Sequence, residues 1–288
     1  MNRGDHMGKI NLKKNQNGKQ SFQIVPVLLI TISILFILLM LVLPMFTVIK
    51  YALLNGLEQY KTAVFDEYTI KAIKLTLLVT ISAVAINTFF GIFAAWVVTK
   101  FVFRGKHFLM TLIDIPFAIS PVIAGLVFIL TFGRIGWAYD LLQAYGIRIV
   151  FAVPGIILAT IFVTFPFISR EIIPVLNAQG KDEEEAAALM GAHGLKIFTH
   201  ITFPHIKWAL LYGIVLCTAR AMGEFGAVSV ISGHLRGKTN TLPLHVEILY
   251  NEFNLTAAFA VSSILVMMAV IILIIRNIVE YKAKRVGK

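Results

Sequence analysis

Long apolar segments separated by short polar connections make up most of this 288-residue chain. A helix that crosses the hydrocarbon core of a bilayer needs about 20 mostly apolar residues. Six segments reach this length, at residues 24–49, 75–98, 108–132, 150–173, 207–230 and 256–275. The fifth is the least uniform, because Arg220 and Glu224 interrupt it. The pattern predicts an all-α, polytopic membrane protein with about six transmembrane helices.

Prolines inside these segments indicate broken helices. They are Pro44, Pro116, Pro121 and Pro166. Non-helical backbone at membrane depth is tolerated where it is buried in protein or lines a cavity. The breaks are therefore compatible with a translocation path, although proline is also frequent in ordinary transmembrane helices.

Residues 177–204 interrupt the apolar pattern between the fourth and fifth segments. Gly180 can end the fourth helix in the left-handed conformation. Asp182 precedes Glu185 by three residues, a capping-box pattern with Asp in place of Ser or Thr. Acids followed by alanines favour a helix of about two or three turns, which Gly191 would end. A helix this short is marginal alone, so it is either a docking element or a capped surface helix in an ordinary loop.

The remainder of this polar stretch suggests how a partner would be met. The small alanines allow close approach, and Leu189 and Met190 offer an apolar tip. Residues 194–201 can form a second short turn. Pro204 fits the first position of the following helix, which predicts where the chain re-enters the membrane.

Composition and charge support the membrane assignment. The chain is 58% hydrophobic and 14% charged, whereas soluble domains carry about 25% charged residues. With the N-terminus inside, the inner regions hold 17 Lys and Arg and the outer regions hold 8. This excess follows the positive-inside rule and explains the net charge of +11 without a nucleic-acid partner. It predicts that both termini and residues 177–204 are cytoplasmic.

The predicted organisation has four parts. They are a cytoplasmic tail (1–22), a first transmembrane helix with its outer loop (23–70), a permease-like core (71–277) and a basic cytoplasmic tail (278–288).

No pattern indicates catalysis or a cofactor within the chain. Cys217 lies in an apolar run and is interpreted as a buried small hydrophobe, and no Cys/His cluster has zinc-ligand spacing. Residues 233–239 (GHLRGKT) resemble a phosphate-binding loop, but three residues separate the glycines where that motif needs four. No predicted strand precedes them, so any energy from ATP must come from a partner.

Arg220 and Glu224 lie four residues apart and can pair on one helix face. Intramembrane charges usually face the protein interior or a water-filled path. Gly223 and Gly226 permit a break or close backbone approach. Free N–H groups near a break, together with a guanidinium, suit a tetrahedral oxyanion. The alternative is a structural ion pair that holds two helices.

Three further charges lie within or at the edges of segments. Asp114 stands two residues before Pro116 and is interpreted as a local cap at a kink. Arg170 and Glu171 lie at the inner edge of the fourth segment and are interpreted as a solvated interfacial pair.

The polar stretch resembles a known motif. Glu185-Ala186-Ala187, three residues, Gly191, nine residues, Ile201, one residue and Phe203-Pro204 match the EAA loop of bacterial ABC-importer permeases, with Phe203 where leucine is usual. The resemblance implies a type I importer permease fold in which this loop is a coupling helix that contacts an ATPase subunit. The contact residues would be Glu185, Ala186, Ala187, Leu189, Met190 and Gly191.

Four other stretches resemble the W-type subunit of sulfate/thiosulfate permeases. They are TLIDIPFAISPVIAGL (111–126), TIFVTFPF (160–167), WALLYG (208–213) and ARAMGEFGAVSVISG (219–233). The implied assembly contains a T-type permease as heterodimer partner, two ATP-binding subunits that hold ATP and Mg²⁺, and a periplasmic or lipid-anchored binding protein in a bacterial inner membrane. The implied pathway residues are Arg220, Gly223, Glu224, Phe225, Gly226 and Ser229.

Two alternatives remain for the function. The Arg-x-x-Gly-Glu-Phe-Gly-Ala core also occurs in molybdate permeases, so another oxyanion such as molybdate or tungstate is possible cargo. An ion-coupled secondary transporter is the more distant alternative, and it would have no use for an ATPase-docking loop.

Overall fold

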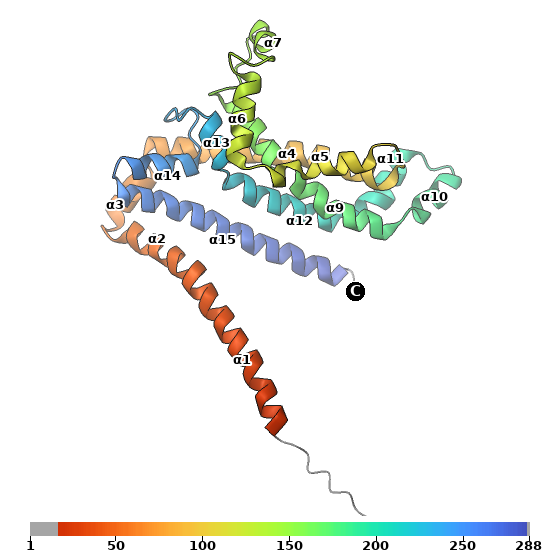
Figure 1. Ribbon diagram of the computed structural model, residues 1–288, viewed down its shortest axis with the longest axis horizontal. Helices are drawn as coiled ribbons and strands as arrows, with labels where there is room; N and C mark the ends of the chain where they lie inside the picture. Colours follow the sequence, from red (N-terminus) through yellow and green to blue (C-terminus); the bar gives the residue numbers. More distant parts are fainter. Residues whose placement is uncertain (1–16, 287–288) are drawn as a thin grey trace, which may run out of the picture. The chain divides into compact units, whose positions relative to one another are not determined.

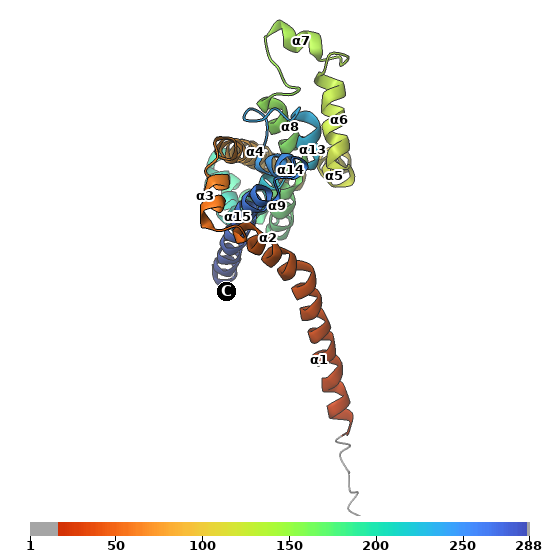
Figure 2. The same ribbon diagram turned by 90° about the vertical axis from the view of Figure 1, so that its left-hand side faces the viewer.

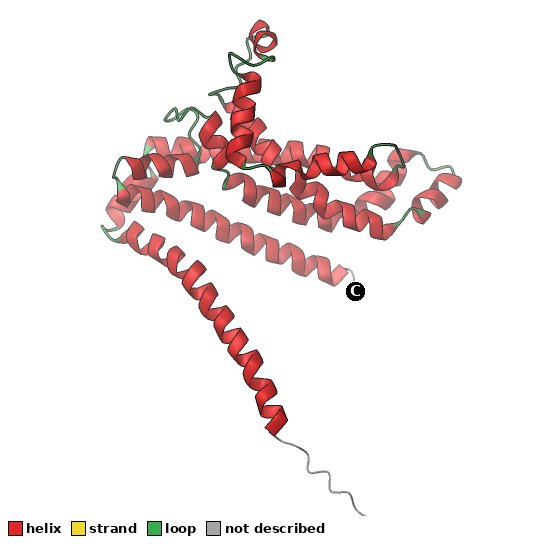
Figure 3. Ribbon diagram, viewed as in Figure 1, coloured by secondary structure: helices red, strands yellow, loops and turns green. Residues whose placement is uncertain are grey.

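The structure is a computed structural model that describes the backbone of residues 17–286 and the side chains of residues 25–283. The described residues form helices, turns and loops without a strand (Figure 3). The predicted tail at residues 1–22 lies largely outside this range, as does the end of the predicted basic tail at 278–288. The all-α prediction is confirmed.

The chain divides into two units at Val48 and Ile49. The first contains α1 (Asn17–Ile37) and a π-helical turn, η1 (Leu38–Val42), and the chain continues into α2 (Leu43–Leu53) (Figure 1). The stretch Val25–Leu53 is long and apolar enough to cross a membrane, as predicted for residues 24–49. Pro44 is the second residue of α2, two positions after the π turn, and it has no N–H to donate to the preceding turn. The wider π turn is the local adjustment around this proline.

Four long helices of the second unit pack side by side (Figure 1). They are α4 (Glu67–Lys100), α9 (Pro166–Gln179), α12 (Phe203–Met222) and α15 (Leu255–Val286). Small residues allow this close packing. A Cβ on Gly91 of α4 would lie 3.1 Å from the Ile168 side chain, and one on Gly213 of α12 would lie 3.1 Å from the Ile168 backbone. Ile168 of α9 is fully buried between them.

Shorter helices complete the second unit. They are α3 (Leu57–Val64), α8 (Val153–Thr164), α13 (Gly226–Ile231) and α14 (Leu242–Asn251). Helix α14 packs on α4 and α15, and α13 packs on α8 and on α6 (Pro121–Phe132). The fully buried residues Ile156, Ala227 and Ile231 belong to the core beneath α13.

The third predicted segment is sharply bent. Helices α5 (Lys106–Ala118) and α6 meet at 109° across Ile119 and Ser120. Pro121 begins α6, where its missing N–H costs nothing. Helix α6 and the short α7 (Tyr139–Ala144) project away from the packed long helices in both views (Figures 1 and 2). The described residues therefore contain five unbroken candidate spans, or six if the bent pair is one span.

The fifth segment differs from its prediction at both ends. We expected residues 207–230, but the helical run extends over Gly194–Met222 and stops at Gly223. It passes through α11 (Gly194–Ile197) and a second π turn, η2 (Phe198–Thr202), before Pro204. Pro204 stands in the first turn of α12, as predicted, but the chain re-enters without a helix break because the π turn absorbs the proline. The same π-turn and proline combination occurs in η1.

Candidate functional site

The predicted coupling loop contains a short helix, α10 (Asp182–Leu189), at the same end of the second unit as the end of α9 and the start of α5 (Figure 1). Its length matches the prediction. The capping box is wrong, because the N-cap is Lys181 and no side chain caps the helix. Asp182 is instead the first residue of α10, so all four acids lie in the first turn, where the helix dipole favours them.

Glycines end α9 and α10 as predicted, but Gly180 is not in the left-handed helical conformation that we expected, because its ψ is −154°. Gly180 ends α9 with a φ of +72°, and Gly191 follows α10 with a φ of +85°. An L side chain is strained at such a φ. The two glycines thus set the chain direction before and after α10.

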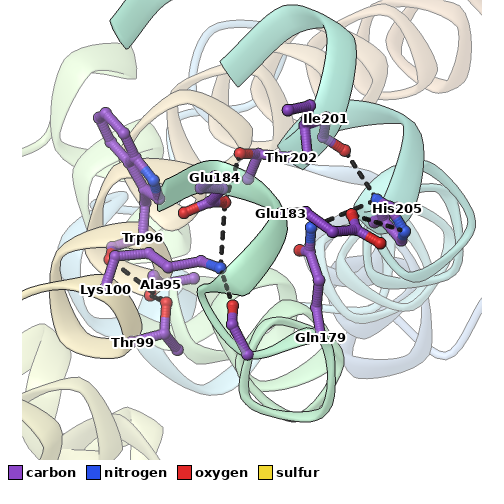
Figure 4. Close-up of polar contacts among 11 residues, drawn as sticks. Ala95, Trp96, Thr99, Lys100, Gln179, Glu183, Glu184, Ile201, Thr202 and His205 are labelled. Carbon is purple, nitrogen blue, oxygen red and sulfur yellow. Dashed lines mark hydrogen bonds and ion pairs between the residues drawn. The ribbon is translucent and has the colours of Figure 1, made fainter. Parts of the chain in front are cut away.

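Glu184 fixes α10 to the rest of the protein (Figure 4). Its carboxylate Oε1 lies 3.0 Å from Lys100 Nζ at the end of α4 and accepts a hydrogen bond of 2.7 Å from the Thr202 hydroxyl. Lys100 Nζ also donates to the Gly180 carbonyl at 2.5 Å. The side chains of Lys100 and Glu184 are only 6% and 15% exposed. This shielded pair joins α4, α10 and η2.

A second, more exposed contact supports the same helix. Glu183 Oε2 lies 3.7 Å from His205 Nε2, and His205 Nδ1 lies 2.8 Å from the Ile201 carbonyl oxygen (Figure 4). Both side chains are about half exposed to solvent. This contact can orient the first turn of α10 but contributes little to stability on its own.

The predicted ATPase-contact residues are mostly on the surface. Leu189 and Met190 are 91% and 88% exposed. Glu185 is exposed, and its side chain has no partner among the described residues. Ala186 is exposed and Ala187 half-buried. These residues are therefore accessible on one short helix, which Glu184 fixes to Lys100 and Thr202.

Sequence reasoning missed the residues that hold α10, namely Lys100, Glu184 and Thr202. Glu184 stands in a run of three glutamates, and no periodicity distinguishes it from Glu183 or Glu185. Lys100 is 84 positions away from Glu184 in the sequence, at the C-terminal end of α4. The one feature of Lys100 visible in the sequence is its place at the inner end of an apolar segment. The positive-inside rule already explains a lysine there, so it did not indicate an ion-pair partner.

The Arg220–Glu224 pair exists and lies at a helix break. Helix α12 ends at Met222, Gly223 and Glu224 are non-helical, and α13 begins at Gly226. Arg220 Nη1 contacts Glu224 Oε2, and Glu224 Oε1 accepts a 2.8 Å hydrogen bond from the Ala227 N–H. The Glu224 side chain is 1% exposed and the Arg220 side chain 32% exposed. Glu224 thus links the end of α12 to the start of α13.

The other predicted pathway residues surround this break in different ways. Gly226 packs against the start of α6, where an added Cβ would lie 3.0 Å from Pro121 Cβ. Phe225 is 40% exposed. The Ser229 hydroxyl donates to the Gly226 carbonyl within α13. Gly226 therefore has a packing role, and Ser229 is engaged locally.

The interpretations of Asp114, Arg170 and Glu171 are wrong. Asp114 does not cap a kink; its Oδ1 accepts a 2.9 Å hydrogen bond from Arg170 Nε, so it joins α5 to α9. Arg170 does not pair with Glu171. The two residues are adjacent and point to different neighbours, because successive residues of a helix are about 100° apart. Glu171 faces α12, where a Cβ added to Gly213 would lie 3.4 Å from the Glu171 Cβ.

Two smaller predictions are resolved by the structure. Cys217 is fully buried, as expected. In the loop of residues 233–239, the Thr239 hydroxyl accepts a hydrogen bond from the Leu235 N–H, and Thr239 is buried. This loop connects α13 to α14, so the phosphate-binding motif has neither its strand nor an available hydroxyl. The described residues contain no cluster of His, Cys, Asp and Glu that could hold a metal.

Known proteins resemble this chain over nearly its whole length. It is 44% identical to the sulfate transport system permease protein CysW of Synechococcus elongatus, with 93% of each chain covered. It is 44% identical to the CysW protein of Escherichia coli K12, covering 90% of this chain and 89% of the relative. The sulfate transport system permease protein CysT of Salmonella typhimurium is 32% identical, with 88% and 91% covered.

A solved structure shares the fold at low sequence identity. One chain of a bacterial ABC transporter involved in the import of the acidic polysaccharide alginate matches with a TM-score of 0.75 and 19% identity, covering 95% of this chain and 99% of that chain. The structural likeness confirms the importer permease fold. In addition, the family model described as binding-protein-dependent transport system inner membrane component matches residues 87–288. The chain therefore belongs to the family of inner membrane components of binding-protein-dependent transport systems.

Proposed function

We propose that this chain is the W-type permease subunit of an ATP-driven importer for sulfate and thiosulfate. The observation that carries the proposal is the 44% identity to permease proteins of sulfate transport systems over about 90% of the chain. The site is consistent with it, since a short helix is fixed by a shielded ion pair and presents an apolar tip to a partner. The chain is a transport subunit and not itself an enzyme.

The partners follow from the same argument. A T-type permease completes the translocation path, as the 32% identity to a CysT protein supports. A binding protein delivers the anion from outside; a solved alginate transporter with the same fold was crystallised with its periplasmic protein. Two ATP-binding subunits, which bind ATP and Mg²⁺, dock on α10. The chain is a multi-pass protein of the bacterial inner membrane, with both termini and α10 on the cytoplasmic side.

Coupling rests on two different parts of α10, an exposed apolar tip that can dock on the ATPase and a shielded ion pair that connects the helix to α4. Leu189 and Met190 expose apolar area that water disfavours, and burial of such area in a cleft of the ATPase would drive docking. Glu184 and Lys100 transmit a displacement of α10 to α4 because their contact is shielded from solvent and short. Motion of the ATPase thereby reaches a helix that spans the membrane.

Arg220 is the candidate oxyanion contact near the helix break. Glu224 neutralises part of its charge and is buried, so Glu224 has the structural role. The guanidinium is still 32% exposed, and a guanidinium has five N–H donors, more than Glu224 Oε2 can accept. Donors of this kind suit tetrahedral dianions. Molybdate and tungstate are tetrahedral dianions like sulfate, so they are the alternative cargo.

The coupling proposal is tested with one variant in α10 and one at the glycine that follows it, neither of which alters the shielded pair. Glu185→Lys and Gly191→Trp should reduce ATP-dependent sulfate uptake at least about tenfold, while the two permease subunits still co-purify. The measurements are uptake of labelled sulfate by proteoliposomes and the amount of ATPase retained on the purified permeases.

Matched controls are available outside the predicted coupling loop. Glu58→Lys reverses an exposed acid on α3, and Gly146→Trp alters a glycine that also has a positive φ and open space around it. These controls should transport normally. Wild-type uptake in the α10 variants would refute the coupling role, and sulfate uptake by this chain in vesicles without ATP would indicate a secondary transporter.

A further inference from the structure

A charged pair on α5 and α9 lies on the surface of the described chain. Arg170 Nε donates to Asp114 Oδ1 at 2.9 Å, and the two side chains are 54% and 46% exposed. The guanidinium carbon lies 4.6 Å from the centroid of the Phe117 ring. A carboxylate therefore holds one edge of the guanidinium while an aromatic ring covers one face.

This pair lies on helices of two candidate membrane segments, toward the end that carries α10. Arg170 is nine residues before the end of α9 at Gln179, and Asp114 is eight residues after the start of α5 at Lys106. With a rise of 1.5 Å per residue, both positions lie roughly 12 to 14 Å along their helices from that end. The two helices thus place the pair at the same depth.

Two observations indicate that this face of α5 is not covered by lipid. Charged side chains within membrane spans face the protein interior or a water-filled cavity, because hydrocarbon does not solvate them. The same helix ends at Ile119 and Ser120, where the backbone turns by 109° and Ser120 is exposed. Non-helical backbone at membrane depth is likewise confined to protein or to a cavity. Asp114, Phe117 and the bend lie within seven positions of one another.

The guanidinium retains donors for a further ligand. Arginine has five N–H groups, and among the described residues the side chain donates to Asp114 through Nε only. Asp114 is the one acid within ion-pair distance in the described part of the chain. A cavity of about 270 Å³ adjoins the pair, between Met110, Ile113, Ile173 and Pro174. A water molecule takes about 30 Å³ of liquid volume, so the cavity can hold a small anion and its remaining hydration.

From this arrangement we propose that Arg170 is a second oxyanion contact, on the inner part of the translocation path. The ligand class is a tetrahedral dianion such as sulfate, and the inference rests on the proposed transport function. The anion accepts hydrogen bonds from Nη1 and Nη2 while Asp114 keeps Nε. The face of α5 and α9 that bears Arg170 is turned toward the path.

Asp114 has a defined role in this proposal. A transport site must bind its ion well enough to accept it and weakly enough to release it. A carboxylate beside the guanidinium repels an approaching dianion and competes for the same donors, so it weakens binding. Phe117 limits the guanidinium to one orientation. Asp114 is therefore a positioning and tuning residue, and Arg170 is the contact.

The test uses the complete importer in proteoliposomes, with ATP inside and labelled sulfate outside. Arg170→Gln should raise the KM for sulfate at least about tenfold, because donors for the anion are lost. Asp114→Asn should keep the transport rate and leave the KM unchanged or lower it. Arg170→Lys should be intermediate, since lysine keeps the charge but loses the planar donors. Arg104→Gln is the matched control, because Arg104 is exposed on the connection that precedes α5.

The outcomes distinguish an anion contact at Arg170 from a purely structural ion pair, here called a latch. They also distinguish failure of this proposal from failure of the proposed transport function. If the pair were only a latch, Arg170→Gln and Asp114→Asn would lower the amount of assembled importer equally and leave the KM unchanged; that result would overturn the proposal. The double variant Asp114→Asn with Arg170→Gln should show the raised KM of Arg170→Gln. If the wild-type importer takes up no oxyanion, the proposed function fails and this proposal fails with it.

Discussion

Two acidic residues, Glu184 and Glu224, are each held by a cation, yet the surroundings of the two pairs differ. At the coupling loop, the Glu184–Lys100 pair is shielded while most other residues of α10 are exposed. At the helix break, Glu224 is buried with Ala227 and Arg220 as its partners, and only Arg220 reaches the surface. The first pair holds an element outward for a partner, whereas the second holds two helices of the same chain together.

In both regions, a residue that fixes the local structure is adjacent in sequence to a residue whose side chain is exposed. In α10, Glu185 is exposed while Glu184, one position earlier, is bound. At the break, Glu224 is bound while Phe225, one position later, is 40% exposed. A sequence motif treats such neighbours as one group. The burial of each side chain in the structure shows that one holds the element in place while the other is accessible to a partner.

The largest effect is expected at the helix break. Glu224→Ala removes the acceptor of the Ala227 N–H and leaves Arg220 without its carboxylate, and breaking a buried pair in this way costs about 3 to 5 kcal/mol. The variant should accumulate poorly in the membrane and unfold at a lower temperature. Both quantities can be measured on the purified permease pair in detergent.

A matched control for this variant is Glu252→Ala. Glu252 also pairs with an arginine, Arg236, at 2.6 Å, but the two side chains are 49% and 35% exposed. Exposed pairs contribute about 0 to 1 kcal/mol, so this variant should accumulate normally. Equal losses in the two variants would show that Glu224 does not hold the break.

An intermediate effect is expected at the coupling loop. Glu184→Gln removes the negative charge opposite the largely buried Lys100 ammonium, which is then left with neutral acceptors only, the new amide oxygen and the Gly180 carbonyl. Weakening a charge-assisted contact in this way costs about 1 to 3 kcal/mol. Because α10 would then move independently of α4, ATP hydrolysis should continue while sulfate uptake falls. The ratio of anions transported to ATP hydrolysed measures this uncoupling.

Glu185→Gln serves as the neighbouring control for that measurement. It changes an exposed carboxylate with no partner in the described chain, so it should leave the transport-to-hydrolysis ratio unaltered even if it weakens docking. A lower ratio in Glu185→Gln than in Glu184→Gln would reverse the assigned roles.

Much of the fold could be predicted from the sequence because membrane insertion depends on local composition. A run of about 20 apolar residues specifies a spanning helix without reference to the rest of the chain. The loop at residues 177–204 was predicted for the same reason, since acids and glycines interrupt an apolar pattern visibly. Gly223 and Gly226 were recognised only as residues that permit a break, and the predicted fifth segment continued past Gly223 to residue 230, whereas the structure ends the helix at Met222. Pro204 was located correctly, but the π turn that precedes it leaves no mark in composition.

Contacts between distant segments could not be predicted in the same way. Asp114 and Arg170 are 56 positions apart, and each had a plausible local partner in Pro116 or Glu171. Only the packing of α5 on α9 shows that they meet. The capping box failed for a related reason: Asp182 has the right spacing to Glu185, but the helix begins at Asp182 itself. Local patterns indicate which residues are able to interact, and tertiary packing decides which of them do.

The smallest effect on stability, and the sharpest test of the comparison, is expected at the tip of α10. Leu189→Ser with Met190→Ser changes two side chains that are 91% and 88% exposed, and surface substitutions of this kind alter the free energy of unfolding by less than about 0.5 kcal/mol. The unfolding temperature of the permease pair should therefore stay the same. Retention of the ATPase should nevertheless fall, because apolar area that would be buried on docking is lost. Normal retention of the ATPase would show that the tip is an ordinary exposed surface, and a fall in unfolding temperature would show that it packs within the permease pair.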